Sequence, residues 1–193
     1  MRFTLLAAAS VLAFAGAPAI AAAAVPSAAV ARQDVTDAEL DSYAAAEEGV
    51  RAVQAQVQGQ ITPEQQAAMV AAIEGAGLTL ERFNAISQTV QAGDDVLAAR
   101  LAVARAPDSP AGSVGAAVTD AELDQFAAAM AGVRPIAEQL NGAAPTAEQQ
   151  TAMAEAIAAS GLELERFNAI SAALRTDERL QARVALAGAR REG

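Results

Sequence analysis

An internal repeat constrains the fold of this chain more than any other feature. The segment that begins V-T-D-A-E-L-D at residue 35 recurs 83 residues later, and 15 of the 25 positions in 35–59 are identical in the second copy. From 62 to 91 the spacing becomes 84, with 18 of 30 positions identical, and it returns to 83 at Leu97. Self-similarity at a fixed spacing is typical of one supersecondary unit that occurs more than once.

The repeat predicts the domain organisation. We expect one helical repeat over 35–105 and a second over 118–189, joined by a Pro-, Gly- and Ser-rich linker over 106–117. Each copy spans about 70 residues, a size at which a single apolar core is usually marginal. We therefore expect the copies to pack against each other as a pseudo-twofold pair, although the linker also permits two independent units.

Capping signals divide each copy into four helices. A Ser, Thr, Asp or Asn before an apolar stripe marks a helix start, and a Glu or Gln three residues later completes a capping box. The expected caps are Thr36, Thr62, Thr79 and Asp94, with Thr119, Thr146, Glu163 and Asp177 in the second copy. We expect Gly59 and Gly142 to end the first helix of each copy. We expect Arg100 and Arg183 to lie toward the C-terminal end of the last helix of each copy, where a positive charge interacts favourably with the helix dipole. No segment alternates as a strand does, so the predicted fold class is all-α.

The composition excludes several chemistries. The chain has no cysteine, histidine, tryptophan or lysine, and its formal charge is -10. These absences exclude a disulfide, a thiolate nucleophile, a histidine metal ligand and a lysine Schiff base. The acidic excess also argues against binding of nucleic acid through bulk electrostatics.

The first thirty residues have the pattern of a secretory signal peptide. Arg2 is followed by an apolar run over 3–15 and then by small residues with A-x-A sites. We expect residues 1–24 to be removed, with cleavage between Ala21 and Ala24 or, alternatively, after Ala31. The apolar run is shorter than the roughly 20 residues that a membrane span needs. We therefore expect a soluble periplasmic or secreted protein with no membrane insertion after cleavage.

Three blocks resemble a known family. They are T-D-A-E-L-D-x-[YF]-A, G-L-x-L-E-R-F-N-A-I and the acidic D-x-x-L start of the last helix, each present in both copies. In these blocks the chain resembles the bacterial exported proteins grouped as domain of unknown function 4168. Members of that family usually carry one copy, and a proline often follows the aspartate where Asp95 and Glu178 stand here. The resemblance implies an envelope location and a small helical domain, but no activity.

The E-R-F-N block contains the candidate interaction residues, which are Arg82, Asn84, Arg166 and Asn168. Asparagine is mildly unfavourable inside a helix because its amide competes for backbone groups. We interpret each asparagine as a clamp whose amide bonds the free backbone at a neighbouring helix end. The alternative interpretation is a contact with a ligand.

No catalytic, cofactor-binding or metal-binding residue is predicted. Adjacent acids on a helix point about 100° apart, so pairs such as Glu47 and Glu48 do not form a chelate alone. The aromatic residues of the mature chain all fall on apolar stripes, where we expect Phe83 and Phe167 to be core residues and the Tyr43 hydroxyl to be merely tolerated. None is left to stack a sugar, base or flavin.

Two functional classes remain. The first is a non-catalytic interaction or structural module of the cell envelope, for which a protein partner is an open question and the oligomeric state is unknown. The second is a hydrolase that uses carboxylates, for instance against the cell wall. A deep cleft that contains a buried carboxylate with a raised pKa would favour the hydrolase.

Overall fold

The computed structural model describes residues 35–57, 59–140 and 143–192, and in this part of the chain the regular structure is entirely helical. The expected all-α class is therefore confirmed. The expected signal peptide lies outside the described residues. The helices are α1 (Asp37–Gln54), α2 (Pro63–Gly75), α3 (Leu80–Gln91), α4 (Asp95–Arg105), α5 (Val114–Ala117), α6 (Asp120–Gln139), α7 (Ala147–Ala159), α8 (Leu164–Ala173) and α9 (Glu178–Glu192).

The helix starts follow the capping signals. Complete capping boxes begin α1, α2, α6 and α7, in which a threonine and the Glu or Gln three residues later bond each other's backbone N–H. Asp94 caps α4, and Asp177 accepts the N–H of Leu180 at 2.8 Å at the start of α9. Glu163 precedes α8 without a side-chain cap, as its weaker capping tendency predicts.

The end of the first helix and the linker both differ from the prediction. Helix α1 ends at Gln54 rather than near Gly59, because the chain tightens there into turns in which Gln56 and Val57 donate to carbonyls three residues back. Gly142 lies outside the described residues. The linker is also not wholly irregular, since Ser113 caps the short helix α5 by accepting the N–H of Ala116.

Each set of four longer helices encloses its own apolar core. The core within α1–α4 includes the fully buried Leu40, Ile73, Ile86 and Leu101, and the core within α6–α9 includes Phe126, Ile170 and Leu180. Small residues let neighbouring helices approach closely. A Cβ built on Gly49 of α1 would lie 2.9 Å from that of Ala72 in α2, and Gly132 of α6 has the same relation to Ala156 in α7 at 3.1 Å.

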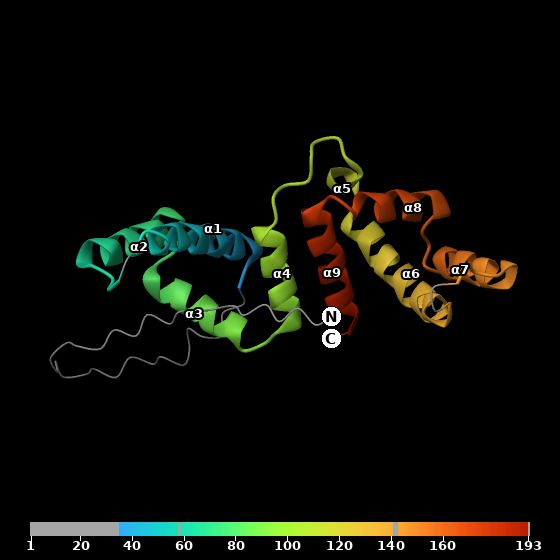
Figure 1. Ribbon diagram of the computed structural model, residues 1–193, viewed down its shortest axis with the longest axis horizontal. Coiled ribbons are helices and arrows are strands. Elements are labelled where there is room, and N and C mark those ends of the chain that lie inside the picture. Colours follow the sequence, from blue (N-terminus) through green and yellow to red (C-terminus); the bar gives the residue numbers. More distant parts are fainter. Residues whose placement is uncertain (1–34, 58, 141–142, 193) are drawn as a thin grey trace.

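The two sets meet where α4 packs against α9. Figure 1 shows these helices side by side at the centre, with α1–α3 on one side and α6–α8 on the other. Helix α1 also packs on α4, and α6 packs on α9, so four helices from both halves surround one central region. This arrangement positions the cleft described next. The energetic coupling of the two halves stays a prediction.

Candidate functional site

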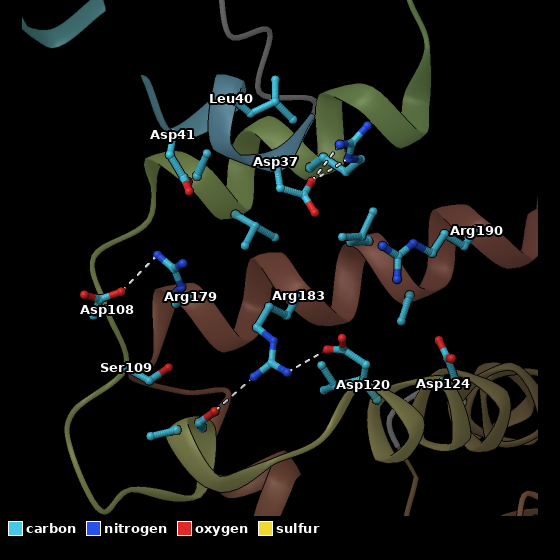
Figure 2. Close-up of a pocket in the computed structure, with 18 residues that line it drawn as sticks. Asp37, Leu40, Asp41, Asp108, Ser109, Asp120, Asp124, Arg179, Arg183 and Arg190 are labelled. Carbon is cyan, nitrogen blue, oxygen red and sulfur yellow. Dashed lines mark hydrogen bonds and ion pairs between the residues drawn. The ribbon is translucent and has the colours of Figure 1, made fainter. Parts of the chain in front are cut away.

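A cleft of about 550 Å³ lies between α1, α4, α6 and α9. Figure 2 shows that charged side chains from both halves of the chain point into it. Its acidic lining residues are Asp37, Asp41, Asp108, Asp120 and Asp124, and its basic ones are Arg100, Arg179, Arg183 and Arg190. The cleft is therefore a region of mixed charge rather than an apolar pocket.

Two ion pairs recur on opposite sides of the cleft. Arg100 of α4 donates from Nε to Asp37 Oδ1 at 2.8 Å and from Nη2 to the carbonyl of Val35 at 2.7 Å. Arg183 of α9, 83 residues later, donates to Asp120 Oδ1 at 2.8 Å and to the carbonyl of Val118 at 3.1 Å. The expectation that these arginines serve the ends of their own helices is wrong. Both lie in mid-helix, where they hold the first residue of another helix and the carbonyl just before its cap.

The linker is bound to the start of α9 at the edge of the cleft. Arg179 donates to the carbonyl of Ala106 at 3.1 Å and pairs with Asp108 at 3.1 Å. Ser109 donates to Asp177 Oδ1 at 2.9 Å. Asp177 is buried, and its Oδ2 has no hydrogen-bond partner among the described residues. This oxygen lies so close to the linker that a Cβ built on Gly115 would collide with it.

Three charged residues of the cleft have no ion pair with another described residue. They are Asp41 and Asp124, which occupy positions 83 residues apart, and Arg190. All five aspartates of the lining are exposed. The one buried carboxylate nearby among the described residues is Asp177, which lies at the edge of the cleft and bonds the linker. Among the described residues, no cluster of three or more metal-ligating side chains is placed to hold a metal ion.

Arg82 and Arg166, two of the predicted site residues, each hold the capping box of another helix. Arg82 of α3 donates from Nε and Nη2 to the two carboxylate oxygens of Glu39, at 2.7 and 3.0 Å. Arg166 of α8 binds Glu122 in the same way, at 2.7 and 3.1 Å. These bonds, together with those from the threonine caps, lower the pKa of Glu39 and of Glu122 to about 2. Both carboxylates therefore stay ionised and structural at neutral pH.

The predicted asparagine clamp is not formed. Asn84 and Asn168 are exposed, and neither amide makes a hydrogen bond within the described part of the chain. The helical period explains the difference. Arg82 and Arg166 lie about 200° around their helices from these asparagines, on the side that meets the start of α1 or α6. In the E-R-F-N block the arginine holds the neighbouring helix start, and the asparagine side chain is exposed.

The aromatic residues are structural, as predicted. Tyr43 stacks on Phe83 with ring centroids 4.8 Å apart, and Phe126 stacks on Phe167 at 4.9 Å. The Tyr43 hydroxyl is more than tolerated, because it lies 2.9 Å from Ser87 Oγ in a hydrogen bond, and Ser87 Oγ in turn donates to the carbonyl of Phe83. Burial raises the pKa of Tyr43 above its ordinary value.

Sequence reasoning missed two recurring ion pairs, Asp37 with Arg100 in the cleft and Glu39 with Arg82 outside it. Asp37, Glu39, Arg82 and Arg100 are each identical at the equivalent position of the second copy. Oppositely charged residues that recur together in a repeat are candidates for mutual contact, and this signal was sufficient to suggest both pairs. The linker contacts of Asp177 and Arg179 had no such signal, because the linker occurs once.

Comparison with known proteins gives one family match. The model of a family described as a domain of unknown function (DUF4168) matches residues 143–184, which lie in the second copy and include α7 and α8. This chain is similar to that family over less than half of its length. No curated protein and no solved structure matches the chain. In the described ranges, no helix has the length and apolar character to cross a bilayer.

Proposed function

We propose that this chain is an exported, non-catalytic helical protein of the bacterial cell envelope, formed by tandem duplication of one helical module and acting through interactions. The pairing of its charges carries this proposal. Four arginines, at equivalent positions of the two copies, bind four carboxylates at the starts of α1 and α6. These eight charged side chains are thus used to hold helices together.

The electrostatics support the same function. A general acid needs a carboxyl group whose pKa is raised toward neutrality by burial or by a neighbouring charge. Glu39 and Glu122 show the opposite, with pKa values of about 2 caused mainly by the arginines. The aspartates of the cleft are exposed and include none of the buried carboxyl groups that a hydrolase would use.

Fractionation of expressing cells tests the export. The mature protein should appear in the soluble periplasmic or secreted fraction, and its sequenced N-terminus should lie between residues 22 and 32. The signal pattern of residues 1–24 gives the reason. A chain that keeps Met1 and sediments with membranes would contradict the proposal.

Incubation with purified cell wall tests the absence of catalysis. We expect no release of soluble fragments or new reducing ends by the wild-type protein. The double variant Asp41→Asn/Asp124→Asn is the matched control, since these two carboxylates are the unpaired acids of the cleft. Fragment release that this variant abolishes would establish a carboxylate-dependent hydrolase instead.

A further inference from the structure

A groove separate from the cleft lies in the second half of the chain, between α6, α8 and α9. Its volume is about 1180 Å³, and its apolar lining includes Phe126, Met130, Leu174 and Val184. The cap and first residues of α4, Asp94 to Val96, complete one edge. A surface of this kind accepts the apolar face of another element, because burial of apolar area is favourable.

The equivalent surface of the first half is a smaller pocket, of about 400 Å³, with a charged lining. Glu47 of α1 and Arg105 of α4 form an ion pair there. The residues 83 positions later are Met130 of α6 and Gly188 of α9, which cannot form such a pair. A Cβ built on Gly188 would meet no atom within 4 Å, so the space that a longer side chain could fill is open. At this position, therefore, the second half has an apolar groove and the first half has an ion pair.

Two arginines line the groove near the C-terminal ends of α6 and α9. Arg134 follows Met130 by one helical turn on α6, and Arg191 follows Gly188 by about one turn on α9. Both are exposed, both line the groove, and neither forms an ion pair within the described part of the chain. The groove thus passes from apolar side chains to charged ones, which are these two arginines together with Asp94 and Asp95 at the start of α4.

We propose that this groove binds an amphipathic helix of a partner protein, whose apolar face ends in an acidic residue that pairs with Arg134 and Arg191. A helix fits because it satisfies its own backbone hydrogen bonds, whereas an extended peptide would bury unpaired N–H and C=O groups between helices that offer no strand edge. The acidic residue fits because a carboxylate complements two arginines that have no other partner in the described structure. This inference rests on the proposed function as an interaction module and names the partner class.

The first test gives the groove the charged pair of the first half. The probe is a fluorescent synthetic 16-residue helical peptide with a leucine and alanine face and a glutamate in the final turn of that face. Fluorescence anisotropy with the full mature chain should show saturable binding. Met130→Glu/Gly188→Arg, which installs the equivalents of Glu47 and Arg105, should weaken binding at least about tenfold. Thermal melting of the variant checks that it stays folded.

The second test isolates the charge. Arg134 is exposed, so Arg134→Gln should leave the fold intact. It should weaken binding of the glutamate peptide by about fivefold, which corresponds to a partly exposed ion pair. A matched peptide with glutamine in place of the glutamate should bind the wild type and Arg134→Gln equally. A similar loss for both peptides would contradict the proposed pairing.

Three further results would overturn the proposal. They are no saturable binding of the glutamate peptide, equal binding by the wild type and Met130→Glu/Gly188→Arg, and groove-dependent binding of phosphatidylglycerol vesicles without binding of the peptide. The last would assign the groove to lipid. Each of these outcomes leaves the proposed function standing, because export and cell-wall hydrolysis are measured separately.

Discussion

Replacement of Glu39 by alanine tests whether the arginine-bound capping box stabilises the fold. The carboxylate accepts hydrogen bonds from the backbone N–H and the hydroxyl of Thr36, both at 2.9 Å, and from two nitrogens of Arg82. Loss of a capping interaction costs about 1 kcal/mol. Loss of a bidentate, partly exposed ion pair adds about 1 kcal/mol after solvent screening. The variant should therefore lose about 2 kcal/mol of unfolding free energy.

Thermal unfolding measures this loss directly. For a chain of 150–250 residues, each kcal/mol lowers the melting temperature by roughly 2–4 °C, so Glu39→Ala should melt about 4–8 °C below the wild type. Glu48→Ala is the matched control, because Glu48 is an exposed acid on the same helix with no ion pair to a described residue. Equal melting temperatures for the two variants would refute the reasoning.

The same variant predicts a pH dependence. The pKa of Glu39 falls from an ordinary 4.5 to about 2 in the folded chain. A lowered pKa means that this stabilisation is complete above about pH 4.5 and is lost as the pH falls toward 2. The difference in melting temperature between the wild type and Glu39→Ala should therefore shrink when the comparison moves from pH 7 to pH 3. A difference that stays constant would show that the ionised carboxylate is not the cause.

Three other substitutions have defined outcomes in thermal unfolding. Phe83→Ala removes a ring that stacks on Tyr43 against the first core and should cost about 3 kcal/mol, while unchanged stability would indicate a ligand contact instead. Gly115→Ala should cost about 1–3 kcal/mol, because the new methyl group would collide with Asp177; melting at the wild-type temperature would show that the linker moves aside freely. Gly188→Ala should stabilise by up to about 1 kcal/mol, since its site is open and alanine favours helix; a lower melting temperature would contradict the open geometry.

The helices could be predicted from the sequence because their signals are local. A threonine cap and the Glu or Gln three residues later are fixed by a single turn of backbone, so the starts of α1, α2, α6 and α7 follow from the chain alone. Helix ends depend more on packing. Gly59 adopts a positive φ of 111°, as glycine can, but α1 has already ended at Gln54.

The site was harder to predict because its contacts join distant segments. Arg82 and Asn84 are both polar and two residues apart, and their exposure differs because the start of α1 lies on one side of α3. The groove depends on a further comparison between the halves. Met130 and Gly188 do not indicate a groove when each is considered alone. The difference between the halves is evident only because Glu47 and Arg105 form an ion pair at the equivalent positions.

The contact between α4 and α9 could also form between two separate chains. If the linker straightened, α9 of one chain would find the same surface on α4 of another, and two chains would close into an exchanged dimer. Ser109, the carbonyl of Ala106 and the carbonyl of Gly115 hold the linker on α9, so straightening breaks several hydrogen bonds together. We therefore expect these linker contacts to oppose exchange between chains.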